Sequence, residues 1–132
     1  MNDLIITNAR LIDGTGSQPR DNVTITVRGG RIEAVRAGGE QTDGEGADVI
    51  DVGGRTLLPG LINAHCHVTM NAGADPFAYT KNTSLPTLLL HSLKRCQQML
   101  EAGITTARDL GGYEYVEMAL RDAFAAGDWP GP

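Results

Sequence analysis

The chain has 132 residues, of which 41% are hydrophobic and 20% charged, a composition typical of one folded domain and unlike that of a disordered protein. The net charge of −5 and the isoelectric point near 5.0 argue against binding to nucleic acid or to an anionic membrane surface. No apolar run approaches the roughly 20 residues that span a bilayer, the N-terminus lacks a signal-peptide pattern, and the cysteines lack disulfide-scaffold spacing, so we expect a cytoplasmic protein.

Residues 1–58 contain short β-prone runs separated by glycines. The first run covers 4–12, and the runs 22–28 and 31–36 alternate apolar and polar residues on either side of Gly29-Gly30. This pattern predicts a hairpin, because glycine readily takes the positive φ that a two-residue turn requires. A surface loop is expected at 37–46, and a second hairpin across Gly53-Gly54. Residues 1–58 are therefore predicted to form a small antiparallel β module that shows no sign of chemistry by itself.

The segment from Leu57 to His67 joins a short apolar run to two histidines at alternate positions. We predict a buried strand in which Asn63, His65 and His67 share one face and Cys66 points to the other. Two neutral imidazoles on one strand face can bind a single metal ion. The spacing alone is also compatible with an alternative, in which the two histidines are polar residues at a strand end that make only local hydrogen bonds. Cys66 is expected to be a packed thiol and no ligand.

From residue 59 the pattern changes to strands that alternate with helices. Residues 68–82 are expected to form a loop, followed by an amphipathic helix that is capped by Thr83 or Ser84 and ends at Gly103. The apolar stripe of this helix is predicted to comprise Leu85, Leu89, Leu93, Cys96 and Leu100. His91 lies off the stripe and is expected to be exposed and not a ligand. A strand at 104–110 and a helix at about 113–126 follow, so the β-α-β-α order predicts parallel strands with a crossover.

Two stretches carry a resemblance to a known family. Residues 59–67 read Pro-Gly-Leu-Ile-Asn-Ala-His-Cys-His, and residues 103–112 read Gly-Ile-Thr-Thr-Ala-Arg-Asp-Leu-Gly-Gly. The first resembles the metal-binding signature of the amidohydrolase superfamily, with Asn63 where an acidic residue is commoner. The second is similar to the second barrel strand in the branch of imidazolonepropionase-related and Xaa-Pro dipeptidase-type enzymes.

The resemblance implies an α/β fold. Residues 1–58 would be part of a β-sandwich, and residues 59–132 would be the first two βα units of a TIM-like (β/α)₈ barrel. Such a barrel needs about 250 residues. We therefore expect the chain to be a truncated fragment of a longer protein.

The resemblance further implies a hydrolase that acts on a carbon–nitrogen bond of a small-molecule substrate, such as an amide, a cyclic amide or a dipeptide. One or two divalent ions, usually zinc, would activate a water and polarise the substrate carbonyl, with His65 and His67 as two of the ligands. Asn63, Arg108 and Asp109 are candidates for contacting the substrate or supporting the metal ligands. A local salt bridge or a helix cap is the alternative for Arg108 and Asp109. No catalytic residue is expected within the chain, because the remaining site residues of the family lie on later strands.

Two histidines do not complete a catalytic zinc site, which normally has three protein ligands. The chain alone is therefore expected to be inactive and to bind metal weakly. One rival hypothesis is a non-catalytic scaffold or interaction protein of the same fold, and another is a free-standing β module that binds a metal or a protein partner. Open sheet edges and an uncovered apolar helix face would favour association between copies, so a homo-oligomer is a further expectation.

Overall fold

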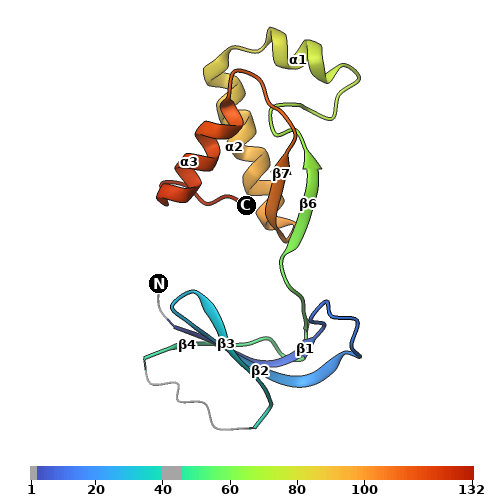
Figure 1. Cartoon of the computed structure of the whole chain (residues 1–132), viewed down its shortest axis with the longest axis vertical. Helices are drawn as coiled ribbons and strands as arrows, with labels where there is room; N and C mark the ends of the chain where they lie inside the picture. The colour runs from blue at the N-terminus through green and yellow to red at the C-terminus, as the bar shows by residue number, and fades with distance from the viewer. Residues whose placement is uncertain (1–2, 40–45) are drawn as a thin grey trace. The chain divides into compact units, whose positions relative to one another are not determined.

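The structure is a computed structural model that describes residues 3–39 and 46–132. The chain divides into two compact units, an N-terminal unit, Met1–Pro59, and a C-terminal unit, Gly60–Pro132. Figure 1 shows strands alone in the first and a mixture of strands and helices in the second. No helix in the described ranges is long and apolar enough to cross a membrane. Of the loop predicted at 37–46, residues 40–45 lie outside the described residues.

The N-terminal unit is a mixed sheet, five-stranded in its described part, that is built around β1 (Leu4–Leu11). β2 (Arg20–Arg28) pairs antiparallel with β1, and β3 (Arg31–Ala37) pairs antiparallel with β2. The first predicted hairpin is confirmed, since Gly29 and Gly30 form its turn with φ of 54° and 75°. The core of the unit comprises buried Leu11, Val23 and Ile25 with partly buried Ile6, Val27 and Leu57.

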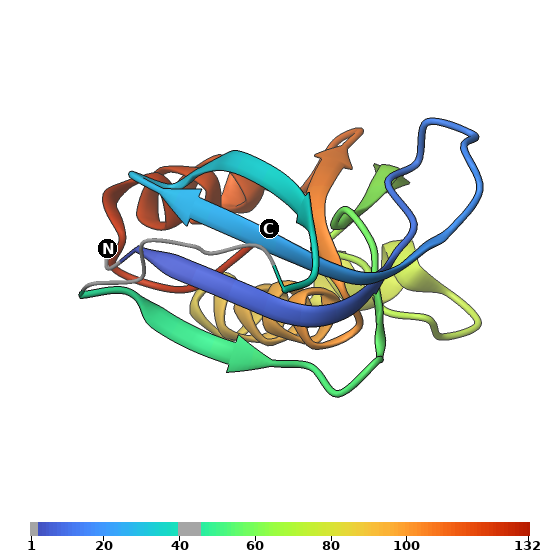
Figure 2. The same cartoon turned by 90° about the horizontal axis from the view of Figure 1, so that it is seen from below.

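The second predicted hairpin is wrong. β4 (Asp48–Asp51) and β5 (Thr56–Leu57) both run parallel to β1 and lie one after the other along it. Figure 2 shows β1 between β2 and β4. Gly53 and Gly54 do turn the chain, with φ of 60° and 77°, but the turn interrupts an edge strand opposite Asn8, whose carbonyl accepts a 2.7 Å hydrogen bond from the Gly54 N–H. A glycine pair fits both a hairpin turn and an irregularity within a strand, so the local pattern could not choose between them.

The C-terminal unit has the predicted parallel strands with a helical crossover. β6 (Leu61–Cys66) pairs in parallel with β7 (Ile104–Asp109), and α1 (Pro76–Asn82) and α2 (Leu85–Glu101) lie between them in sequence. α3 (Val116–Ala126) follows β7, and α2 and α3 lie on the same side of the two strands (Figure 1). The core between these layers comprises Cys66, Val68, Leu88, Cys96, Val116 and Leu120.

The loop predicted at 68–82 is wrong in its second half, where α1 forms. The Asp75 side chain caps this helix by accepting a 2.9 Å hydrogen bond from the Ala78 N–H, and Pro76 occupies its first turn. A capping aspartate followed by proline is a helix-start signal, because proline has no N–H to leave unsatisfied there. The many small residues of the segment concealed this signal.

The buried face of α2 also differs from the prediction. Ser84 occupies the N-cap position but its side chain makes no capping bond, since its hydroxyl donates to the Thr87 hydroxyl at 2.8 Å, whereas Gly103 has the expected positive φ of 84°. Cys96 of the predicted stripe is buried, but the fully buried positions are Leu88 and Ser92, each 0% exposed. Leu85 and Leu89 of the predicted stripe are 47% and 36% exposed. Ser92 can be buried because its hydroxyl donates to the Leu88 carbonyl at 2.8 Å, which satisfies its polar group inside the core.

The prediction that β6 is a buried strand holds only at its carboxyl end. Cys66 and, just beyond the strand, Val68 are buried under α2 and α3, whereas Leu61 and Ile62 are 53% and 71% exposed. Within residues 60–132 the helices cover one face of a two-stranded sheet, so apolar side chains away from that contact stay exposed.

Candidate metal centre

His65 and His67 lie at the carboxyl end of β6, with His65 exposed and His67 partly buried. Their ring centroids are 5.3 Å apart and the ring planes meet at 75°. Because residues two apart in a strand point the same way, the alternate spacing brings the two imidazoles together.

The ring of His67 is oriented by a hydrogen bond of 2.7 Å between its Nδ1 and the carbonyl oxygen of Gly111. A carbonyl oxygen can only accept, so Nδ1 carries the proton and Nε2 keeps a free lone pair. Histidines that bind metal commonly donate their other ring N–H to a carbonyl or carboxylate in this way. In this tautomer Nε2 is the ring nitrogen whose lone pair is open to a cation.

Asp109 joins the segments that follow the two strands. One carboxylate oxygen accepts from the Val68 N–H and the other from the Gly111 N–H, both at 2.9 Å. Between them, the Leu110 N–H donates to the Cys66 carbonyl at 3.1 Å. Val68 follows His67 directly and Gly111 holds its ring, so Asp109 fixes both neighbours of this imidazole.

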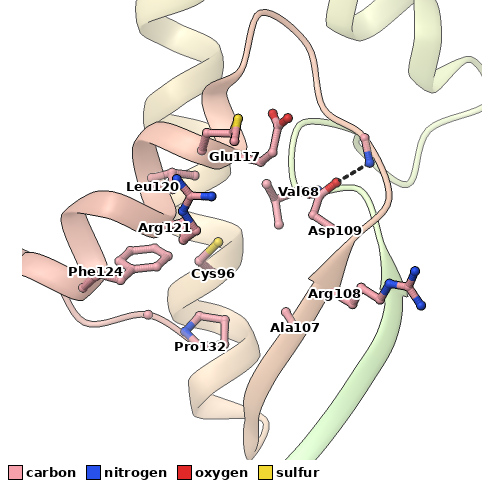
Figure 3. A pocket seen from close by; sticks show the side chains of 14 residues that line it. Val68, Cys96, Ala107, Arg108, Asp109, Glu117, Leu120, Arg121, Phe124 and Pro132 are labelled. Carbon is pink, nitrogen blue, oxygen red and sulfur yellow. Dashed lines mark hydrogen bonds between the residues drawn. The ribbon is translucent and has the colours of Figure 1, made fainter.

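Asn63 and Arg108 have different surroundings. The Asn63 side-chain oxygen accepts from the backbone N–H of His65 at 3.2 Å, which makes it a local support of the strand end. Arg108 is exposed, and Figure 3 shows its guanidinium directed away from Cys96 and Ala107. Alternation along β7 therefore puts Arg108 on the face of the sheet that the helices leave open.

The cysteines are core residues, as the sequence predicted. Cys66 and Cys96 are buried and free, and burial raises the pKa of both thiols, that of Cys96 to about 11. A thiol with a raised pKa is protonated at neutral pH and is a poor metal ligand or nucleophile. His91 is exposed, as predicted, and its Nδ1 lies 2.6 Å from the Tyr79 hydroxyl.

A pocket of about 760 Å³ lies between β7, α2 and α3, on the helix-covered side of the sheet. Figure 3 shows Cys96, Ala107, Leu120 and Phe124 around it, with Asp109 at its upper margin. Neither His65 nor His67 lines this pocket. It is therefore separate from the pair of imidazoles.

The described residues contain no group of three or more histidine, cysteine, aspartate or glutamate side chains placed to hold a metal ion. Two imidazoles are what this part of the chain brings together. The roles in binding that the sequence predicts stay predictions for all five candidates, His65, His67, Asn63, Arg108 and Asp109.

A profile of the amidohydrolase family matches residues 56–132, which is more than half of the chain. The chain belongs to the amidohydrolase family. Its family match begins just ahead of the histidine pair and includes both parallel strands. The similarity to imidazolonepropionase-related and Xaa-Pro dipeptidase-type enzymes that the sequence predicted is also confirmed by individual proteins.

An adenine deaminase from Mesorhizobium japonicum is 36% identical over 66 residues, which cover 50% of this amidohydrolase chain and 11% of the relative. An imidazolonepropionase from Idiomarina loihiensis is 28% identical over 132 aligned positions, covering 82% of this chain and 32% of the relative. The crystal structure of a Xaa-Pro dipeptidase with bound methionine superposes with a TM-score of 0.83 at 25% identity, covering 98% of this chain and 32% of that chain. The chain thus spans at most about a third of the length of these proteins.

Sequence reasoning missed three residues that shape the centre. Gly111 lies just after the predicted strand at 104–110, where the sequence indicates no role for it, but its carbonyl orients His67. Arg95 and Tyr79 were assigned no role, yet Arg95 binds the Val68 carbonyl at 2.9 Å and the Tyr79 hydroxyl at 3.0 Å. An arginine in the middle of an amphipathic helix was the one available signal, and it fits an exposed position equally well.

Proposed function

We propose that the whole protein is a metal-dependent hydrolase that acts on a carbon–nitrogen bond of a small molecule, and that His65 and His67 supply two of its metal ligands. The observation that carries the proposal is the pair of adjacent imidazoles, with His67 held by Gly111 so that Nε2 is free. Membership of the amidohydrolase family supports it, as do relatives named adenine deaminase, imidazolonepropionase and Xaa-Pro dipeptidase.

The donor set suits a divalent first-row ion, since imidazole is a good ligand for zinc. Two nitrogens are fewer than the three protein ligands of a typical catalytic zinc, so we propose that further ligands come from outside residues 1–132. A bound ion would polarise the carbonyl of the substrate and lower the pKa of a water. Within this chain, His65 and His67 hold the ion, while Asp109 and Gly111 keep His67 in place.

Arg108 is proposed to contact the substrate. It lies on the open face of the sheet, which it shares with His65, and it is the residue that precedes Asp109 at the carboxyl end of β7. A guanidinium there can bind an acceptor oxygen of the substrate and orient it toward the imidazole pair.

The proposed architecture of the whole protein follows the family resemblance. Residues 59–132 would be the first two βα units of a (β/α)₈ barrel and residues 1–58 part of a β-sandwich. In the described residues β7 pairs with β6 alone, so its other edge offers the place where the next strand would pair.

The metal site can be tested on the 132-residue chain, which has exactly three histidines and so contains its own control. On titration with Zn²⁺, followed by NMR of the imidazole nitrogens, His65 and His67 are expected to shift together and His91 to stay unchanged. Binding should be weak and should be lost in His65→Ala and in His67→Ala but kept in His91→Ala. Equal shifts at all three histidines would contradict the proposed site.

The activity is tested on the complete gene product loaded with Zn²⁺, with dipeptides, cyclic amides and amidines as substrates. Hydrolysis should be lost in His65→Ala and His67→Ala and kept in His91→Ala. A wild-type protein that binds Zn²⁺ at the pair yet hydrolyses none of these classes would favour the non-catalytic scaffold.

A further inference from the structure

The turn that follows β6 is fixed by hydrogen bonds from several elements. Val68 and Thr69 in this turn are 5% and 0% exposed, so their backbone polar groups need partners within the protein. Each successive carbonyl has a donor within reach: His67 accepts from the Met70 N–H at 3.0 Å and Val68 from Arg95 Nη1 at 2.9 Å. The Thr69 carbonyl lies 3.3 Å from the Thr80 hydroxyl, whose single proton it shares with the Pro76 carbonyl at 2.8 Å. Two of the three donors are side chains of α1 and α2.

Arg95 is the charged member of this set, and it is held in a single orientation. Its Nη1 donates to the Val68 carbonyl at 2.9 Å, its Nη2 donates to the Tyr79 hydroxyl at 3.0 Å, and its guanidinium carbon lies 5.3 Å from the centre of the Tyr79 ring. Because the Tyr79 oxygen accepts from Arg95, its own proton is free to be donated to His91 Nδ1, 2.6 Å away. The planar guanidinium makes both bonds at once, which a lysine ammonium cannot do in the same geometry.

A continuous series of hydrogen bonds leads from Arg95 to the imidazole of His67. Arg95 binds the carbonyl of Val68, and the N–H of Val68 binds Asp109. Asp109 also binds the N–H of Gly111, whose carbonyl accepts from His67 Nδ1. Val68 is the residue directly after His67 and is therefore held from both sides by charged groups, one from α2 and one from β7.

We propose that Arg95, braced by Tyr79, is a positioning residue for His67: it fixes the turn after β6 so that Nδ1 of His67 stays bonded to Gly111 and Nε2 stays available. The inference rests on the proposed metal site, and it assigns the α1–α2 pair a role in that site beyond covering the core. If Arg95 only fastened the helices together, its loss would lower stability without changing the state of the His67 ring.

The test compares Arg95→Met, Arg95→Lys and Tyr79→Phe with Lys94→Met, a matched removal of an exposed positive charge at the neighbouring position of the same helix. The readout is the tautomer of His67 in long-range ¹H–¹⁵N spectra of the 132-residue chain at pH 8. The thermal midpoint is recorded for each variant, so that spectra are compared below unfolding. The Zn²⁺ dissociation constant is measured on the same samples from the ring signals.

Wild type and Lys94→Met are expected to show the Nδ1–H tautomer of His67. Arg95→Met should show a mixture of the two His67 tautomers. In Arg95→Lys and Tyr79→Phe, the fraction of the Nδ1–H tautomer should lie between that of wild type and that of Arg95→Met. Zn²⁺ binding should weaken by about three- to tenfold in Arg95→Met, at or below the lower end of the loss seen when direct partners of metal-binding histidines are removed.

An unchanged tautomer and unchanged Zn²⁺ affinity in a destabilised but folded Arg95→Met chain would overturn the proposal, as would an equal effect of Lys94→Met. If Arg95→Met does not fold, Tyr79→Phe decides, because it removes one hydroxyl and keeps the ring. A wild-type chain whose histidine pair ignores Zn²⁺ would refute the metal site, and the tautomer comparison would still decide whether Arg95 positions His67.

Discussion

Replacing Asp109 by alanine should destabilise the C-terminal unit more than any change to an exposed carboxylate. The substitution removes the acceptor of two hydrogen bonds of 2.9 Å, from the N–H groups of Val68 and Gly111. A hydrogen bond to a charged group contributes about 1.5–3 kcal/mol to stability. Gly111 is exposed, so its N–H can bond to water instead, whereas Val68 is 5% exposed and its N–H would be left without a partner.

We therefore expect Asp109→Ala to lower the free energy of unfolding by about 2–3 kcal/mol, because only one of the two donors loses its partner entirely. In a unit of this size, that corresponds to a fall of about 10–20 °C in the thermal midpoint. Asp109→Asn should cost about half as much, since the amide keeps one acceptor oxygen while its NH₂ group faces the second N–H.

The single tryptophan, Trp129, belongs to the C-terminal unit, so thermal and urea unfolding followed by its fluorescence report on that unit. Hydrogen exchange at the Val68 amide gives an independent local measurement. Asp128→Ala is the matched control, because Asp128 is an exposed carboxylate of the same unit. Equal midpoints for Asp109→Ala and Asp128→Ala, or an unchanged exchange rate at Val68, would refute the view that Asp109 holds the two segments.

Two further predictions concern the helices of the C-terminal unit. Burial raises the pKa of the Cys96 thiol from 9.0 to about 11, so the protonated thiol favours the folded state. The stability that this group contributes is complete below pH 9 and is lost as the pH rises toward 11. In urea titrations, this loss of stability should be smaller for Cys96→Ala than for wild type. At Gly103, where φ is 84° and an added Cβ would meet no atom within 4 Å, Gly103→Ala should cost about 1 kcal/mol through backbone strain alone. Gly103→Asn should cost less, because asparagine tolerates the left-handed region, and equal losses for the two variants would contradict this explanation.

Local patterns predicted correctly those elements whose conformation is set by residues close together in the sequence. Alternating residues around Gly29-Gly30 predicted the first hairpin, and Gly103 marks the end of α2 as expected. The alternate spacing of His65 and His67 likewise brings the two rings together, because side chains two apart in a strand must point the same way.

The errors arose where one local pattern fits two tertiary arrangements. Gly53-Gly54 turns the chain as predicted, but only pairing with β1 decides that the turn lies within an edge strand. Along α2, the predicted stripe holds at Cys96, which is buried, but packing against the strands buries Leu88 and Ser92 in place of Leu85 and Leu89. Ser92 is compatible with the core only because the helix supplies an acceptor for its hydroxyl.

The sequence by itself determined the chemistry of the centre: two imidazoles at the end of one strand, a second parallel strand ending in Arg108 and Asp109, and the family to which the chain belongs. Only the tertiary structure decided which contacts fix the ring of His67 and the turn that follows it. The bond from His67 to Gly111 and the placement of Arg95 on Val68 join residues that lie 44 and 27 positions apart in the chain. Hydrogen bonds across such distances depend on the register of β6 with β7 and on the packing of α2, and neither leaves a periodic signal in the residues concerned.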